Sequence, residues 1–283
     1  MKKVKLLVDS TCDLPLNLLK ANDVDIIPLM VNFNEEGYED LVELSTADLY
    51  RKVEEKGILP KTAARSIEKF KEVYQKFFDQ GYEEIVFIGI SGYFSSTIQN
   101  ALTAGNKFPG RVFVHDSLNL SSGEGLQILK AIEMIKEGLE GKEILSRLQE
   151  IAPRVRSQFA VESLEYLYKG GRCSQTSYYF GKGFKIKPII RVVDGKMIVY
   201  KKPIGKMENA LNKMIEILKS DWGNVDLGTV MITHSMADSS AEYLHRKLKE
   251  FVPEDKIMIT DAGCVISSHC GKGTIGILYI LKP

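Results

Sequence analysis

A cluster of hydroxyl side chains follows an apolar run in the first third of the chain. The run, residues 85–90, is typical of a buried strand, and it stops at Ser91-Gly92. Ser95-Ser96-Thr97 then precedes a helical pattern, where such side chains commonly cap the first turn. Because a helix start carries unpaired amides and a partial positive charge, this turn is expected to bind an anion. A capped turn without a ligand is the equal alternative.

Other polar residues are candidates for the same site. Ser10 follows the apolar run 4–8, at the carboxyl end of an expected strand, where open α/β sheets bind ligands. Thr62 lies in an expected loop, residues 59–66. Capping of a turn is the alternative role for both.

His269 lies among small residues at an expected turn before the final strand. With a serine it could serve nucleophilic catalysis, and alone it could donate to an anion. The sequence has no nucleophile elbow around Ser91 and no obvious acid partner for the histidine, which favours the anion. A histidine is more often protonated near about pH 6, so its contribution should grow there.

The composition excludes several functional classes. The 283 residues are 44% hydrophobic and carry a net charge of +1, so we expect neither nucleic-acid binding nor stable membrane insertion. The N-terminal apolar run is too short for a signal sequence, so we expect a cytoplasmic protein. The cysteines are scattered without zinc spacing, which predicts free thiols and no metal or cofactor: Cys12, Cys173, Cys264 and Cys270.

The glycine-rich segment near the C-terminus is not a nucleotide-binding motif. Residues 271–276 match the pattern GxGxxG, but they open a strand instead of a helix, and the chain ends before the acidic residue that should follow. Gly273 stands where a Walker motif needs serine or threonine after its lysine. The sequence therefore predicts no phosphate-binding loop here.

The order of elements predicts two α/β domains. Strands and helices alternate over about the first 150 residues, which favours parallel strands with helical crossovers. After residues 151–153 the pattern of strands and helices changes, and residues 187–193 and 196–202 read as a hairpin around Asp194-Gly195. We therefore expect domains at 1–156 and 157–283, the second with a mixed or antiparallel sheet, and a ligand cleft between them.

Several short motifs, taken in order, resemble the DegV family of fatty-acid-binding proteins along essentially the whole chain. No single motif is decisive, but together they are specific. They are residues 8–15 (VDSTCDLP), Lys61-Thr62, Ile90-Ser91, residues 95–101 (SSTIQNA), Asp116-Ser117, residues 167–172 (LYKGGR), Lys187-Pro188-Ile189 and residues 269–273 (HCGKG).

The resemblance implies a Rossmann-like first domain, an α/β second domain and one fatty acid in a tunnel between them. It implies that Thr62, the Phe94-Ser95 turn and His269 hold the carboxylate. Residues expected behind these groups, or in contact with a partner, are Ser10, Ser91, Ser96 and Arg172. It also implies that the protein has no catalytic centre and that a separate kinase subunit phosphorylates the bound fatty acid.

The chain departs from the family pattern in three places. Ser96 stands where the family often has glycine, and Lys272 stands where it often has proline. The segment after the hairpin, residues 202–206, lacks an arginine that the family often carries there. This last departure bears on coupling to a kinase and leaves lipid binding unaffected.

A bound acyl chain requires a long apolar tunnel. Burial of about 0.8 kcal/mol per CH₂ gives a chain of roughly 16 carbons, such as palmitate, near 10 kcal/mol before ordering costs. Ordinary core packing is the alternative for each candidate tunnel residue: Leu126, Leu129, Ile132, Tyr178, Phe180, Phe184 and Ile186.

Two other functions compete with lipid binding. A serine-type acyl hydrolase would use Ser95 or Ser91 with His269. A nucleotide-binding regulatory domain is suggested by the α/β half alone. Both remain alternatives to a carrier of long-chain fatty acids.

Overall fold

The first half of the chain is organised around a parallel sheet. In the computed structural model, which describes residues 2–173 and 186–283, its order is β2 (Val24–Ile27), β1 (Val4–Asp9), β6 (Glu84–Gly89), β7 (Val112–Asp116). Every residue of β1 and β6 is buried, as is usual for central strands of a parallel sheet, and most of these residues are apolar. This confirms the parallel α/β arrangement.

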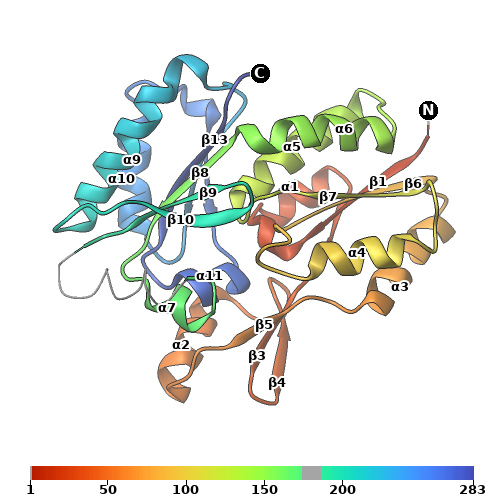
Figure 1. The fold of residues 1–283 in the computed structure, drawn as a ribbon, viewed down its shortest axis with the longest axis horizontal. Coiled ribbons are helices and arrows are strands. Elements are labelled where there is room, and N and C mark those ends of the chain that lie inside the picture. The colour runs from red at the N-terminus through yellow and green to blue at the C-terminus, as the bar shows by residue number, and fades with distance from the viewer. Residues whose placement is uncertain (1, 174–185) are drawn as a thin grey trace.

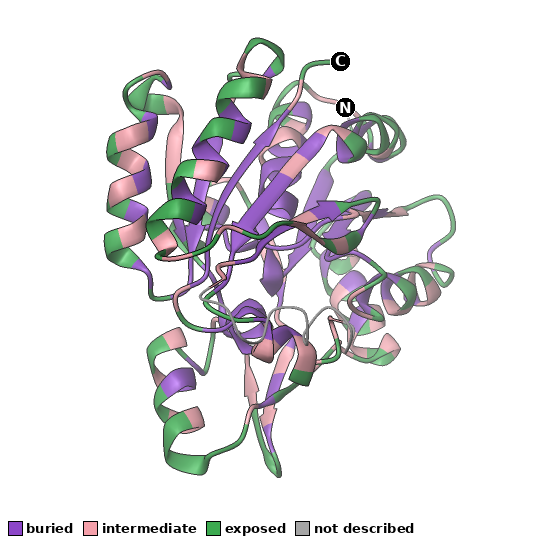
Figure 2. Cartoon of the chain, turned by 60° about the vertical axis from the view of Figure 1, so that its left-hand side comes forward, coloured by how far each residue is buried: buried purple, intermediate pink, exposed green. Residues whose placement is uncertain are grey.

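Helices cover both faces of this sheet (Figure 1). The helices α3 (Ile67–Asp79) and α4 (Thr97–Gly105) pack on one face through an aromatic cluster that includes Phe70, Tyr74 and Phe87. The opposite face is covered by α1 (Leu16–Ala21), α5 (Ser122–Lys136) and α6 (Gly141–Ile151). Figure 2 shows the strands buried between helices whose outer faces are exposed.

The second half forms a six-stranded mixed sheet in the order β10, β9, β8, β13, β11, β12. The β11–β12 pair is parallel and the other pairs are antiparallel, which confirms the expected mixed sheet. Its strands are β8 (Val155–Ala160), β9 (Ile189–Val193), β10 (Lys196–Lys201), β11 (Val230–His234), β12 (Ile257–Asp261) and β13 (Ile275–Ile280). The helices α9 (Met207–Asp221) and α10 (Asp238–Leu248) pack against one face.

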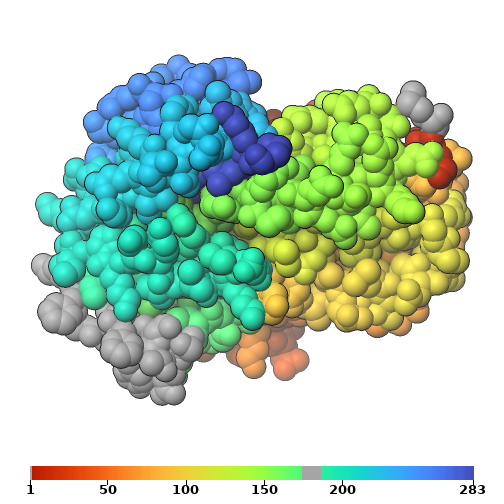
Figure 3. All heavy atoms as spheres, turned by 45° about the horizontal axis from the view of Figure 1, so that its top comes forward, coloured from red at the N-terminus to blue at the C-terminus, as the bar shows by residue number. Residues whose placement is uncertain are grey.

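Helix α5 is shared by the two sheets. Its apolar side chains join one core cluster that contains strand residues of the first sheet and also Val155, Leu278 and Ile280 of the second. Residues 122–128 are therefore buried on every side of the helix. Figure 3 shows the two halves of the chain side by side, in close contact.

This shared helix contains three of the residues that the sequence analysis placed in the acyl tunnel. Leu126 and Ile132 are members of the core cluster, and Leu129 packs against it. The apolar pattern of α5 serves contact with two sheets, so these three side chains belong to the core and do not line the large cavity described below.

A small third sheet lies below the others in Figure 1. Its order is β4 (Glu36–Glu39), β3 (Met30–Phe33), β5 (Lys61–Ala63), and both pairs are antiparallel. It packs with α2 (Thr46–Lys56) and α11 (Cys264–Cys270) around a core that contains Val31, Leu49 and Val265. Helix α7 (Glu165–Lys169) contacts α11.

Strands β2 and β3 are close in sequence but belong to different sheets, and Pro28, which has no N–H for a ladder, lies between them. Two local expectations are corrected by this region. Residues 61–63 form the strand β5 where a loop was expected. Residues 264–270 form α11 where a turn was expected.

The chain crosses from the first half to the second between α6 and β8. Residues 152–154 form a 3-10 turn, like residues 10–12, 222–224 and 254–256, and β8 begins at Val155. The predicted boundary after residue 156 therefore lies inside β8, and we propose placing it before Val155. Among residues 2–173 and 186–283, no helix combines the length and apolar character needed to cross a bilayer.

The aromatic cluster predicts a large effect of core truncation. Phe87 is fully buried and meets Phe70 edge to face, with ring centroids 5.2 Å apart. Phe87→Ala should lower the free energy of unfolding by about 3–5 kcal/mol, measured by urea titration. Leu102→Ala on exposed α4 surface is the control and should stay within about 0.5 kcal/mol of the parent protein. Equal losses in the two variants would contradict this assignment of the core.

Candidate functional site

A large cavity opens beyond the carboxyl ends of β6 and β7. Its volume is about 790 Å³, within the range of small-molecule sites. The first half supplies Leu29, Thr62, Ala63, Ala64, Ile90, Gly92, Tyr93, Phe94, Ser95, Ser96, Ile98, Gln99, Asp116 and Leu120. The second half supplies Arg172, Met197, Val265, Ile266, His269 and Cys270. Both halves of the chain therefore form its wall.

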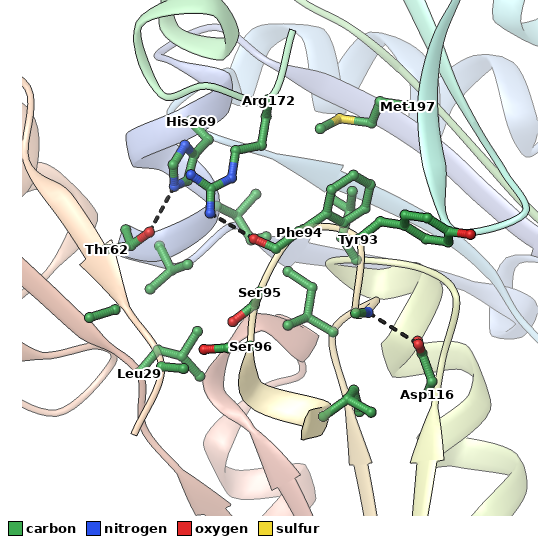
Figure 4. A pocket seen from close by; sticks show the side chains of 18 of the residues that line it. Leu29, Thr62, Tyr93, Phe94, Ser95, Ser96, Asp116, Arg172, Met197 and His269 are labelled. Atoms are coloured by element: carbon green, nitrogen blue, oxygen red, sulfur yellow. Dashed lines mark hydrogen bonds between the residues drawn. The ribbon is translucent and has the colours of Figure 1, made fainter. Parts of the chain in front are cut away.

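A direct contact joins the two halves at one end of the cavity (Figure 4). The Oγ1 atom of Thr62 lies 2.8 Å from Nε2 of His269. Thr62 is fixed because β5 pairs with β3, where it lies opposite Val31. His269 is fixed because it lies in the last turn of α11. The structure thus brings together two residues that the sequence had placed in separate loops.

The imidazole of His269 is held in its neutral form. Burial, and secondarily the nearby Arg172 charge, lowers the pKa of His269 to about 4. This corrects the expectation of protonation near about pH 6. Its Nδ1 is buried and has no hydrogen-bond partner among the described residues. Because an unpaired buried N–H is rarer than an unpaired acceptor, we infer that the proton is on Nε2 and is donated to Thr62.

This tautomer sets the direction of the Thr62 hydroxyl. If Thr62 accepts from His269, its own proton remains to be donated to a ligand in the cavity. The histidine then acts on a ligand through Thr62. An anion bound here would strengthen the arrangement because a hydroxyl proton is drawn toward negative charge.

Arg172 places a positive charge beside this pair. Its guanidinium donates to the carbonyl oxygens of Gly170 at 2.7 Å and Phe94 at 2.6 Å. The first oxygen ends α7 and the second lies in the turn after β6, so the side chain spans the two halves. The sequence had placed Arg172 behind the head-group site, and the structure places it in the cavity wall.

A glycine allows His269 to approach α7. A Cβ atom on Gly170 would lie 2.3 Å from Nδ1 of His269 and 3.0 Å from the carbonyl oxygen of Tyr166. No side chain fits in that space. Close packing against the imidazole therefore explains Gly170, the first of the two glycines in the segment KGGR.

Most backbone amides of the turn after β6 have hydrogen-bond partners within the protein. The amides of Phe94 and Ser95 both donate to the carbonyl oxygen of Ser91, at 2.9 and 3.3 Å. The amide of Gly92 donates to Asp116, and that of Thr97 donates to Ser95 Oγ at 3.3 Å. The expectation of free amides is therefore corrected for these residues.

The Ser95 side chain has a local partner but borders the cavity. Its Oγ lies 2.8 Å from Oγ1 of Thr97, and either hydroxyl can be the donor. If Thr97 donates, the Ser95 proton remains available to a ligand. Neighbouring Ser96 is exposed, and its side chain makes no capping hydrogen bond to α4.

The charges around the cavity are unevenly placed. Figure 4 shows Arg172, His269 and Thr62 together on one side of the turn and Asp116 on the other. Asp116 accepts from the amides of Gly92 and Leu118, at 3.1 and 2.9 Å. A bound anion would therefore be favoured at the Arg172 end and opposed at the Asp116 end.

Two serines expected near the site do not line this cavity. Ser91 is fully buried and donates to the carbonyl oxygen of Gly195 at 2.9 Å, which joins the first half to the hairpin turn. Ser10 is also fully buried and donates to Asp40 at 2.8 Å. Both hydroxyls are used in contacts within the protein.

A second, much smaller space lies beside the cavity. This void of about 30 Å³ shares Leu120, Ile266 and Cys270 with the large cavity. It is lined further by apolar residues that include Phe159, Val192 and Leu278, and by polar residues that include Ser157, Thr233 and His234. The sequence analysis missed this set because its members come from distant segments, and only tertiary contacts bring them together.

The prediction of an acyl tunnel remains untested at the other residues that the sequence analysis assigned to it. Ile186 pairs in an isolated bridge with Ile204 and is not among the residues that line either space. Tyr178, Phe180 and Phe184 lie outside the described residues. The part of the chain that is described contains no group of three or more His, Cys, Asp or Glu side chains arranged to hold a metal ion.

The chain matches one family over almost its full length. Residues 3–282 match the family described as uncharacterised protein, DegV family. A protein of Thermotoga maritima named fatty acid-binding protein is 33% identical over 282 residues, covering 97% of this chain and 96% of that protein.

Solved structures share the same fold. One, described as fatty acid binding of a DegV family protein from Thermus thermophilus, has a TM-score of 0.90 at 28% identity and covers 99% of each chain. Another, a stearic acid-binding protein from Eubacterium ventriosum, has a TM-score of 0.84 at 25% identity and covers 100% of this chain and 99% of that one.

The depressed pKa of His269 predicts a specific pH dependence of stability. The unfolded chain protonates this histidine near 6.5 and the folded protein only near 4, so its contribution is complete above 6.5 and is lost as the pH falls. His269→Gln should therefore lose less unfolding free energy than the parent protein between about pH 7 and pH 5. Urea titrations at the two pH values measure the difference. Parallel losses in both proteins would contradict a neutral buried imidazole.

Proposed function

Because the chain belongs to the DegV family, we propose that it binds one long-chain fatty acid in the cavity between its halves. The observation that carries the proposal is a large cavity with polar groups and the positive charge of Arg172 at one end and apolar side chains along its wall. The relatives named for fatty acid binding support the ligand class.

The carboxylate is assigned to the Arg172 end of the cavity. There Thr62 donates its hydroxyl proton, Ser95 donates from the turn after β6, and Arg172 supplies charge. His269 orients Thr62, to which its Nε2 lies close. The local carbonyl oxygens of Gly170 and Phe94 keep the guanidinium in place.

The acyl chain is assigned to the apolar wall. From the polar end it passes Ile90, Met197 and Ile266 and reaches toward the small void beside Leu120 and Phe159. Burial of an acyl chain of roughly 16 carbons contributes about 10 kcal/mol before ordering costs. Each hydrogen bond to the carboxylate contributes about 1.5–3 kcal/mol. The tail therefore supplies most of the affinity, and the head group decides the orientation.

The protein is proposed to be a carrier that presents the carboxylate to a separate kinase subunit. Support comes from the position of the head-group end beside the exposed residue Ser96, which follows Ser95 in the turn after β6. The absence of an arginine from residues 202–206 leaves the docking of such a subunit to other residues. This part of the proposal rests on the family resemblance.

A serine hydrolase is the weaker alternative. His269 Nε2 faces Thr62, whereas Ser91 donates to Gly195 and Ser95 pairs with Thr97. A serine nucleophile needs a base within hydrogen-bond reach. Neither serine has that contact with His269 among the described hydrogen bonds, so the geometry favours binding over catalysis.

Purified protein should carry one fatty acid per chain. The apolar side chains in the cavity wall would otherwise face water. Native mass spectrometry should show the polypeptide plus one acyl mass, and organic extraction should release the lipid. A bare polypeptide mass that persists after incubation with palmitate would contradict the proposed function.

Removal of two hydroxyls should weaken binding without unfolding the protein. Thr62→Val with Ser95→Ala removes two donors to a charged partner, so affinity should fall on the order of a hundredfold or more. Displacement of a fluorescent fatty acid measures the change, with a melting curve run alongside.

Thr103→Val is the matched control for the hydroxyl substitution. Thr103 is half-buried on α4 outside the cavity lining, and its hydroxyl donates to the carbonyl oxygen of Gln99. It should leave affinity unchanged. A lowered melting temperature with undiminished affinity in the double variant would refute the head-group assignment.

A further inference from the structure

Helix α11 begins against two buried carboxylates from the first half of the chain. The amide of Gly263 donates to Asp13 Oδ1 at 2.8 Å, and the amide of Cys264 donates to Asp40 Oδ1 at 2.8 Å. Helix starts are usually capped by a neighbouring side chain. Here the partners are 250 and 224 positions away in the sequence.

The two carboxylates are themselves held in place. Asp40 is fully buried and accepts from Ser10 at 2.8 Å, and the Ser10 oxygen in turn accepts from the amide of Leu29 at 3.0 Å. Asp13 is 3% exposed and accepts from Ser121. These contacts fix the positions of the two acceptors.

Gly263 lets the helix approach closely. A Cβ atom there would lie 2.8 Å from the Leu41 side chain, 3.3 Å from Asp40 Oδ1 and 3.4 Å from Asp13 Oδ1. Beside it, Thr46 donates to the carbonyl oxygen of Ala262 at 2.8 Å. Residues 40–46 of the first half therefore contact the start of α11 through hydrogen bonds and close packing.

The other end of α11 carries His269. The helix spans Cys264–Cys270, about 10 Å, and is short enough to move as one rigid piece. Thr62, which contacts His269, lies on β5, and β5 itself contacts α11. A shift at the start of the helix would therefore change the contact between His269 and Thr62.

We propose that Asp13 and Asp40 are positioning residues of the head-group site. By fixing the start of α11 from across the seam between the halves, they hold His269 against Thr62. The ligand test of this inference rests on the proposed binding of a fatty acid. A role in stability alone would leave the preference for a carboxylate unchanged.

The test compares two ligands with the same tail. Palmitate has a carboxylate, and hexadecan-1-ol has an uncharged hydroxyl. Asp40→Ala should bind palmitate roughly tenfold more weakly and hexadecan-1-ol within about twofold of the parent protein. Asp40→Asn keeps an acceptor for the Cys264 amide and should restore the ratio of the two affinities.

Glu84→Ala is the matched control. Glu84 is also a buried carboxylate that accepts from a helix start, the amide of Gly141 at 2.7 Å, but it lines neither space near the head group. This variant should lose stability and keep the ratio of affinities. An unchanged ratio in Asp40→Ala as well would overturn the positioning role.

A second measurement needs no lipid. The titration of His269, followed by NMR of the imidazole, should move in Asp40→Ala from about 4 toward the ordinary 6.5, because a loosened α11 admits water. Asp40→Asn should titrate as the parent protein does. If Asp40→Ala fails to fold, Gly263→Ala tests the same point by displacing the helix start.

The two readouts separate the two proposals. If the parent protein binds neither ligand, the proposed function fails, and the NMR titration alone decides the positioning role. If the parent protein prefers palmitate and the variants change neither the preference nor the titration, the proposed function stands and the positioning role is refuted.

Discussion

The capping of a short helix across the seam between the two halves is the interaction on which the site depends. Helix α11 has only seven residues, too few to be stable alone. Its start is satisfied by Asp13 and Asp40, and its apolar face packs on the small sheet. Without these contacts, His269 would have no fixed position relative to Thr62.

The burial of those carboxylates has an electrostatic cost that the surrounding donors offset. Burial raises the pKa of Asp40 to about 6, while Ser10 and the amides of Cys264 and Val265 favour its charged form. The pKa of Asp13 is raised for the same reason, with the Gly263 amide and Ser121 opposing. Buried polar groups of this kind specify one arrangement, because any displaced partner leaves a carboxylate unsatisfied.

Different parts of the fold form the polar end of the cavity and its apolar surroundings. The polar end is built from a strand edge, a turn and two helix ends, each fixed by hydrogen bonds. The apolar interior is what remains between α11, the hairpin and the six-stranded sheet, where side chains such as Leu120 and Ile266 border both spaces. The apolar residues Leu126, Leu129 and Ile132 of α5 pack against both of the larger sheets and line neither of these two spaces.

The sequence by itself determined the elements whose signals are local. The apolar runs of β1 and β6, the Asp194-Gly195 hairpin and the hydroxyl cluster after β6 can each be identified from neighbouring residues, and ordered motifs identify the family. Only the tertiary structure decided what depends on distant segments. It placed β5 beside β3, stabilised α11 through two remote carboxylates, kept His269 neutral, and assigned the apolar side chains of α5 to the core. The physical reason is that capping, burial and packing depend on contacts between residues that are distant in sequence. Local periodicity does not specify those contacts.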